Sequence, residues 1–202
     1  MAEISSGVIT LVFNFIILKL AGNIGVAAYG IVANVSLVAV AVFNGVAQGS
    51  QPLVSDCYGK RNMSDVRTLK RLSFLTTLIL AVVMYTAIFI FTDGIVRVFN
   101  SENSVQLAQY AAVGVRLYFT GILFSGVNIV GGSYLSATEK AKAAFIVSVL
   151  RGFILIVVFA FVLSLIFGMN GVWLSYMAAE LCTTIVLLIF NHKYSKNTEI
   201  IG

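Results

Sequence analysis

No charged residue occurs between Lys19 and Asp56, and this uncharged run constrains the chain more than any other feature. A soluble fold needs charged side chains on its surface, and about 25% of its residues are usually charged. Here only 10% of the 202 residues are charged, 59% are hydrophobic, and the mean hydropathy is +1.00. Such a chain has too little polar surface to cover a water-soluble globule. The sequence therefore predicts an integral membrane protein.

Six apolar runs are long enough to cross a bilayer as helices, which takes about 20 mostly apolar residues. They cover residues 4–20, 25–54, 72–91, 107–135, 143–167 and 172–190. The second run is longer than a bilayer requires, so we expect that helix to tilt, kink or project. The predicted fold class is an all-α membrane bundle of six helices, in one unit from residue 1 to residue 202.

The basic residues between these runs predict the orientation of the bundle. Nine of them fall on one side of the predicted membrane: Lys60, Arg61, Arg67, Lys70, Arg71, Lys140, Lys142, Lys193 and Lys196. The opposite side has Arg97, with Lys19 at the edge of the first run. Because cytoplasmic loops carry an excess of Lys and Arg, both termini are predicted to lie in the cytoplasm and the chain in the plasma membrane. Residues 64–71 are predicted to form a short amphipathic helix on the cytoplasmic surface, held by anionic lipid headgroups.

Several function classes lack support in the sequence. The net charge of +5 does not indicate nucleic-acid binding, because the basic residues lie between apolar runs. The sole histidine, His192, lies in the terminal tail, and Cys57 and Cys182 have no metal-ligand spacing. No HExxH, Walker or GxGxxG motif is present. We expect no enzyme activity, no cofactor and no bound metal.

Lys19 and Arg116 lie near the ends of their predicted spans, whereas Arg151 and Glu180 fall deep inside theirs, where an unpaired charge is costly. Each of the latter two lies about 12 to 14 Å from the membrane surface at which its helix enters, since a helix rises about 1.5 Å per residue. The two helices are neighbours joined by a "GMNG" turn, so the charges reach a similar depth. The first expectation is an ion pair inside the bundle. The alternative is a titrating proton or cation site at Glu180, although an Arg partner would make it a poor proton carrier.

The stretch "GVAQGSQPLVSDCYGKR" (45–61) ends the long uncharged run and contains the only proline, Pro52. Proline removes a backbone donor and weakens the helix one turn earlier, at Gln48. Gln48 and Gln51 could bond the backbone that this kink frees. The stretch could instead act as a hinge at the inner mouth of a cleft.

Carboxamides occur within several of the predicted spans, at Asn14, Asn34, Asn44, Gln48 and Asn128. Such groups often bond neighbouring helices. Carboxamides on different spans could equally line a water-filled cavity, and the sequence leaves both possibilities open.

Three stretches resemble a known family. "GNIGVAAYGIVANVSLVAVAVFNGVAQGSQPLVSDCYGKRN" resembles the signature of the multidrug and toxic compound extrusion (MATE) transporters, in which "AAYGI" leads through a helix to "G-x-Q-P-L-V-S-x-x-Y-G". "GGSYLSATEKAKAAFIVSVLRGF" and "FGMNGVWLSYMAAE" resemble later spans of the same family. Family members have twelve spans in two six-helix lobes around a central cleft. The resemblance implies that this chain is the second lobe. We expect it to be a fragment, a truncated product or a half-size transporter.

The resemblance also implies roles for individual residues. Asn14, Asn34 and Asn128 correspond to spans that line the family's cleft. Glu3 matches a cation-coupling acid of some members. A second such acid falls near Ser125, which is not an acid, so coupling is also expected from the first lobe.

The function expected from the resemblance is export of organic, often cationic compounds. The lobe would belong to a Na⁺- or H⁺-coupled prokaryotic antiporter that works by rocking two lobes around a midplane cleft. Its expected partners are membrane lipids and either the first lobe or a second copy of itself. The alternatives are a relative that flips lipid-linked sugars, which would favour a basic cleft, and a non-transporting membrane scaffold or truncated remnant.

Overall fold

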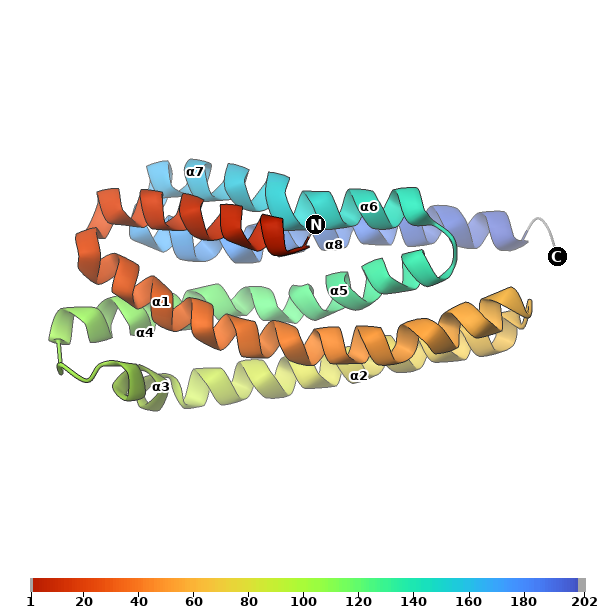
Figure 1. Cartoon of the computed structure of the whole chain (residues 1–202), viewed down its shortest axis with the longest axis horizontal. Helices are drawn as coiled ribbons and strands as arrows, with labels where there is room; N and C mark the ends of the chain where they lie inside the picture. The colour runs from red at the N-terminus through yellow and green to blue at the C-terminus, as the bar shows by residue number, and fades with distance from the viewer. Residues whose placement is uncertain (1, 200–202) are drawn as a thin grey trace.

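The computed structural model describes the backbone of residues 2–199 and the side chains of residues 9–194. Within these residues the chain is almost entirely helical (Figure 1). In chain order, the elements are α1 (Ala2–Gly59), α2 (Met63–Ile90), α3 (Thr92–Phe99), α4 (Val105–Tyr118), a 3₁₀ turn (Phe119–Gly121), α5 (Ile122–Ala137), α6 (Ala141–Val149), a π turn η2 (Leu150–Ile154), α7 (Leu155–Phe167) and α8 (Met169–Glu199).

Five helices in the described residues are long and apolar enough to cross a membrane. They are α1, α2, the α4–α5 pair, the α6–α7 pair and α8. The first of them contains two of the predicted runs, because α1 consists of two helices that meet at a kink. With α1 counted as two crossings, the chain is an all-α membrane bundle of six helical segments, which is the predicted fold class.

The kink in α1 lies at Gly22, whose backbone angles are φ 63° and ψ −157°. This region of conformational space is essentially closed to residues with a side chain. Figure 1 shows that α1 reverses here: its red half lies beside α7, and its orange half returns along α5 and α2. The glycine therefore allows one helix to supply two neighbouring crossings.

The start of α2 differs from the prediction for residues 64–71. These residues do not form a separate surface helix but the first turns of α2, which continues to Ile90. The side chain of Asn62, two residues before the predicted helix, caps α2 by accepting a hydrogen bond from the backbone N–H of Asp65 at 3.3 Å. Because no breaker follows, the helix runs unbroken from its basic end into its apolar part.

Helix α5 lies in the middle of the bundle and packs against α1, α2 and α8. A Cβ atom on Gly126 would lie 2.6 Å from Cγ2 of Thr77 and 2.7 Å from the ring of Phe43. All three residues are buried. The absent side chain thus lets α1 and α2 approach α5 closely.

Large apolar side chains cover much of the outside of the bundle. Leu165 is 86% exposed, and Ile90, Ile166 and Leu188 are each more than half exposed. Such a surface is unfavourable in water and favourable against lipid. The connections α1–α2 and α5–α6 lie at one end of the bundle, and α3–α4 and α7–α8 at the other (Figure 1). The first of these ends carries Lys60, Arg61 and Lys140.

Candidate functional site

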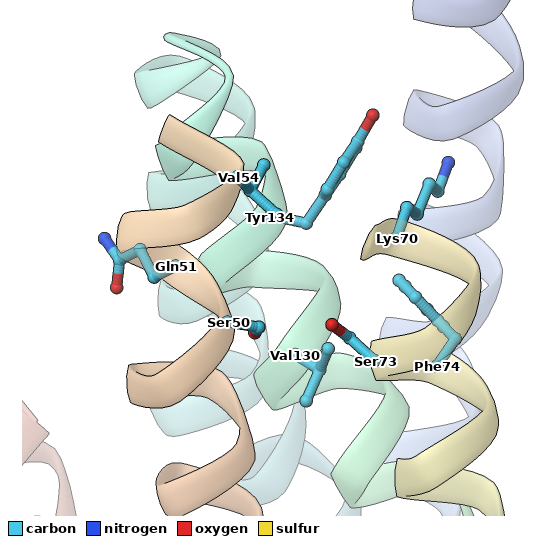
Figure 2. A pocket seen from close by; sticks show the side chains of 8 residues that line it. All are labelled: Ser50, Gln51, Val54, Lys70, Ser73, Phe74, Val130 and Tyr134. Carbon is cyan, nitrogen blue, oxygen red and sulfur yellow. The ribbon is translucent and has the colours of Figure 1, made fainter. Parts of the chain in front are cut away.

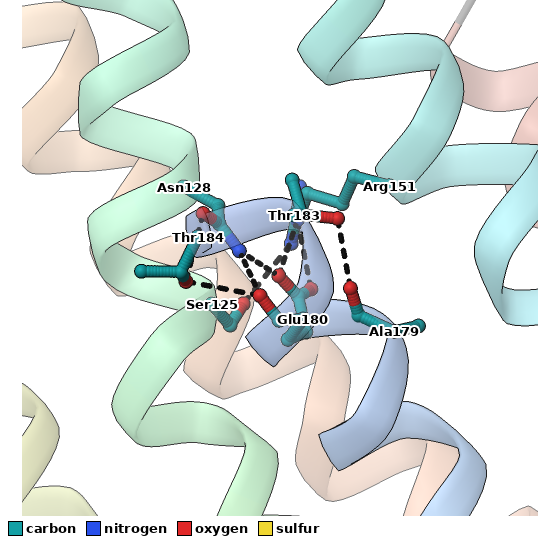
Figure 3. Close-up of polar contacts among 7 residues, drawn as sticks. All are labelled: Ser125, Asn128, Arg151, Ala179, Glu180, Thr183 and Thr184. Atoms are coloured by element: carbon teal, nitrogen blue, oxygen red, sulfur yellow. Dashed lines mark hydrogen bonds and ion pairs between the residues drawn. The ribbon is translucent and has the colours of Figure 1, made fainter. Parts of the chain in front are cut away.

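A cluster of polar side chains lies buried where α5, the π turn η2 and α8 meet (Figure 3). At its centre, Nε of Arg151 donates to both carboxylate oxygens of Glu180, at 2.8 Å to Oε1 and 3.1 Å to Oε2. The structure thus brings together the two intramembrane charges that the sequence expects to pair.

Helix α5 supplies two more members of the cluster. Nδ2 of Asn128 donates to Glu180 Oε2 at 2.7 Å and to the backbone oxygen of Glu180 at 2.8 Å. The hydroxyl of Thr184 donates to Oδ1 of Asn128 at 3.0 Å. Nη2 of Arg151 donates to Oγ of Ser125 at 3.0 Å. The charged pair is therefore enclosed by neutral hydrogen-bonding groups.

The local backbone explains why these side chains converge. Tyr176, Glu180 and Thr184 are spaced four residues apart on α8, so they share one face of that helix. Arg151 lies in the π turn, a widening of the helix that often occurs at functional positions. The reversal at Gly168, with φ 58°, turns the chain from α7 into α8 and makes these helices direct neighbours.

The cluster is electrically neutral and well shielded. The side chain of Glu180 is 3% exposed and that of Arg151 is 25% exposed. A buried ion pair is tolerated when its remaining polar atoms are hydrogen-bonded, as both carboxylate oxygens are here. Glu180 therefore has a counter-cation inside the bundle. Among residues 9–194, no group of three His, Cys, Asp or Glu side chains is placed to hold a metal ion.

The second polar feature is an exposed face on the second half of α1. It consists of four carboxamides, Asn34, Asn44, Gln48 and Gln51, all of which are exposed in this chain. All four lie on one side of the helix. Exposed residues such as Leu37 and Ala41 lie between them on the same side. We call these four residues the carboxamide face. It lies within the run that contains no charged residue.

The members of the carboxamide face differ in their hydrogen bonds. Nδ2 of Asn34 donates to the backbone oxygen of Gly30 at 2.8 Å, and Oε1 of Gln51 accepts from Ser133 at 3.1 Å. Asn44 and Gln48 form no side-chain hydrogen bond to another described residue. These two side chains are therefore available to a ligand or a partner.

The structure does not bring the three predicted cleft residues together. Asn34 is exposed and Asn14 is partly buried on the other half of α1. Asn128 is only 1% exposed and belongs to the buried cluster. In this structure it therefore does not line an open cleft, contrary to what the resemblance implied. The side chain of Glu3, the expected coupling acid, lies outside the described residues.

Pro52 does not break α1, because Gly22 is the residue at which the helix leaves helical backbone angles. Gln48 and Gln51 are exposed and do not bond the backbone freed by the proline. The backbone oxygen of Ala47, one residue before the carbonyl that the proline frees, accepts from Ser50 at 3.2 Å and from Ser133 at 3.4 Å.

Two hollows in the bundle are too small or too open to hold an organic substrate by themselves. The inner one, between α1, α2 and α5, has room for about one water molecule (Figure 2). Figure 2 shows Ser50 and Ser73 on its walls, with Lys70 and Tyr134 above them. The outer one is an open depression between α4 and α8 that is lined by Gln106, Gln109 and Asn170.

The sequence analysis did not predict two members of the buried cluster, Ser125 and Thr184. The sequence identifies Ser125 only as a position without an acid, whereas its hydroxyl contacts Arg151. Thr184 lies one turn after Glu180, and this four-residue spacing from a buried charge was a usable signal.

Comparison with known proteins gives a consistent result. The family model described as MatE matches residues 1–162. "Multidrug export protein MepA" of Staphylococcus saprophyticus is 26% identical over 189 residues, covering 93% of this chain and 41% of the relative. The protein of the same name from Staphylococcus haemolyticus is 28% identical over 186 residues, covering 91% of this chain and 40% of the relative. The chain therefore spans about two fifths of the length of these curated relatives.

Solved structures match the fold over nearly the whole chain. An outward-facing multidrug resistance MATE family transporter has a TM-score of 0.90 and 14% identity, covering 98% of this chain and 44% of the other. An inward-facing structure of the same description has a TM-score of 0.91 and 15% identity, covering 98% and 46%. A transporter from Pyrococcus furiosus, described as having a binding pocket of reversed polarity, has a TM-score of 0.86 and 15% identity, covering 96% and 43%.

The fold and the matched structures define one lobe of a helical membrane transporter. The family match extends over most of the chain, and the family's sequence motifs are present. The chain belongs to the MATE family of multidrug transporters.

Proposed function

We propose that this chain forms the second lobe of a cation-coupled antiporter that exports organic, often cationic compounds. The names of the curated relatives, which are multidrug export proteins, support export of drug-like compounds. The lobe would act in a prokaryotic plasma membrane with both termini in the cytoplasm, and without enzymatic activity.

The carboxamide face of α1 is the observation that carries this proposal. Four carboxamides exposed on one side of an apolar helix are costly against lipid and favourable against a water-filled cleft or a polar ligand. Carboxamide oxygens can accept hydrogen bonds from an organic ammonium group, and their dipoles stabilise its charge without binding it as tightly as a carboxylate would. We therefore assign the cleft surface of this lobe to Asn34, Asn44, Gln48 and Gln51.

The same face distinguishes the exporter from a flippase for lipid-linked sugars. An anionic diphosphate substrate would favour lysine or arginine side chains along the cleft. The helix that carries the carboxamide face has no basic residue between Lys19 and Lys60. This composition favours neutral or cationic cargo.

Alternating access requires a partner lobe. That partner is either a complementary first lobe or a second copy of this chain. Rocking of two lobes also requires that each lobe keep its internal packing. The buried cluster supports this, because it ties α5, the π turn and α8 together. The similar match to outward-facing and inward-facing relatives is further support for a lobe that moves as a unit.

We assign the coupling of export to Na⁺ or H⁺ movement to a residue other than Glu180, because Arg151 already neutralises that carboxylate. Glu3 or an acid of the partner lobe would supply the coupling site. Under this proposal, Glu180 preserves the shape of the lobe and takes no part in ion movement.

Ethidium accumulation in drug-sensitive bacteria tests the proposal, with the protein expressed together with its partner lobe. Export should lower accumulation, and a protonophore or removal of Na⁺ should abolish the effect. Asn44→Leu with Gln48→Leu should raise accumulation towards that of empty cells. Thr76→Leu with Thr86→Leu, which replaces exposed polar residues of α2, is the matched control and should leave export intact. Unchanged export by the α1 variant at equal expression would refute the assignment of the cleft surface.

A further inference from the structure

Two lysines from distant parts of the sequence meet at the basic end of the bundle. Nζ of Lys70, in the second turn of α2, donates to Oδ1 of Asn191 on α8 at 3.1 Å. It also lies 4.7 Å from the ring centre of Tyr134 on α5. Nζ of Lys140, just before α6, lies 4.9 Å from the ring centre of Tyr194 on α8. The fold thus places two ammonium groups among α2, α5, α6 and α8.

Neither ammonium group forms an ion pair with a carboxylate of the described side chains. The ion pairs among the described side chains join Lys60 to Asp56, Arg116 to Asp93, and Arg151 to Glu180. Both lysines are partly buried. Burial and the nearby charge of Lys70 lower the pKa of Lys140. The neighbouring acid Glu139 is exposed and forms no ion pair with a described residue. The two lysines contact Asn191 and Tyr194, which lie three residues apart on α8, so two partly desolvated positive charges share one part of the bundle.

The amino terminus of α6 adds to this positive field. Helix α6 begins at Ala141, and no side chain caps its first turn. The first backbone N–H groups of a helix have no partner within the helix, and they attract anions. Since Lys140 immediately precedes this turn, its ammonium group and these N–H groups belong to the same end of the helix.

The surroundings of the lysines are those of a membrane interface. The stacked rings of Phe190 and Tyr194 lie 6.3 Å apart beside Lys140, and tyrosine is enriched at headgroup level. Apolar side chains of the adjoining helices are exposed, among them Leu72, Phe145 and Leu188. An acyl chain could lie along such side chains while its headgroup reached the lysines.

We propose that Lys70, Lys140 and the first turn of α6 bind the phosphate of an anionic glycerophospholipid from the leaflet at this end of the bundle. Basic pockets between membrane helices are suited to such headgroups. The phosphate separates the two ammonium groups and accepts hydrogen bonds from both. The bound lipid joins α2, α6 and α8 at a position where no carboxylate does so among the described residues.

Native mass spectrometry of the full chain, purified from membranes and delipidated, measures this binding with phosphatidylglycerol as the probe. Lys70→Gln with Lys140→Gln should weaken binding by about 10-fold or more, since a lysine near an anionic headgroup contributes about 1 kcal/mol. Arg61→Gln with Lys193→Gln removes the same charge from exposed positions at the same end, outside the proposed site, and is the matched control. Equal weakening in both double variants would show a diffuse charge effect and overturn the site.

Three further measurements keep the test decisive if the glutamine variant folds poorly. Phosphatidylglycerol should raise the Tm of the unaltered protein more than phosphatidylcholine does, and an equal rise would overturn the preference for an anionic lipid. Lys70→Arg with Lys140→Arg should retain binding. Inorganic phosphate at millimolar concentration should not displace the lipid, and efficient displacement would assign the site to a free anion.

Discussion

Arg151 and Glu180 form an ion pair at 2.8 Å inside the bundle, although 28 residues and a helix reversal separate them in the chain. The carboxylate accepts from Asn128 as well, so removing either charge leaves polar groups without partners inside the bundle. The pair therefore holds three helices in register more than it contributes net stability.

Arg151→Ala alone should destabilise the protein by about 3 to 5 kcal/mol, the usual effect of leaving one buried charge unpaired. Glu180→Ala should have a similar effect. In the double variant the remaining cost should be smaller than the sum of the two single effects, because no charge is left unpaired. Unfolding in detergent, followed by Tm and denaturant midpoint, measures all three variants.

Ser164→Ala is a suitable control for this cycle, because its buried hydroxyl donates only to the backbone of its own helix, at 2.9 Å to Phe161. It should change stability by much less than Arg151→Ala. If the double variant is as unstable as the sum of the single variants, the two charges do not act as partners.

A second prediction concerns close packing around α5. Gly126→Ala places a methyl group within 2.6 to 2.8 Å of Thr77 and Phe43, so it should destabilise the protein by about 1 to 3 kcal/mol. Gly132→Ala on the same helix has no neighbouring atom within 4 Å and should be neutral or slightly stabilising. Thermal unfolding of the two variants side by side gives the comparison. Equal Tm values would contradict the packing described for Gly126.

The apolar runs and the buried charges were predictable because each depends on residue type. A span must be apolar, and an arginine and a glutamate in neighbouring spans have few alternatives to pairing. The buried face of each helix was not predictable in the same way. In lipid both faces of a helix are apolar, so hydrophobic periodicity does not separate core from surface. For this reason Asn34 and Asn128 looked equivalent in the sequence, whereas one is exposed and the other is buried.

In two places the sequence also did not predict where a helix begins or ends. Residues 64–71 have the pattern of a surface helix, but nothing in them stops the helix, so it continues as α2. Gly22 lies in "AGNIG", where a loop was expected between two spans. Gly22 is the residue with non-helical backbone angles, so the two halves of α1 are separated by a kink and not by a loop.

The break in α1 gives a third prediction. Gly22→Ala should destabilise the protein by about 1 to 3 kcal/mol, because alanine is strained at φ 63° and ψ −157°. The space around Gly22 is open, so this cost comes from the backbone and not from a steric clash. Gly30→Ala, also in open space but at a helical position, is the matched control and should be tolerated. If the two variants have the same unfolding midpoint, the backbone angle at Gly22 is not essential to the fold.

The last prediction tests the orientation that the basic loops indicate. After Cys57 and Cys182 are replaced by alanine, single cysteines are introduced by Ser101→Cys and His192→Cys, both at exposed positions. Ser101 follows α3, at the end of the bundle opposite to the α1–α2 connection, whereas His192 lies near the end of α8. Because the basic residues favour the cytoplasm, a membrane-impermeant maleimide should label the Ser101→Cys variant in intact cells and the His192→Cys variant only after lysis. Labelling in the opposite order would reverse the orientation, and with it the leaflet from which the two lysines could bind a lipid.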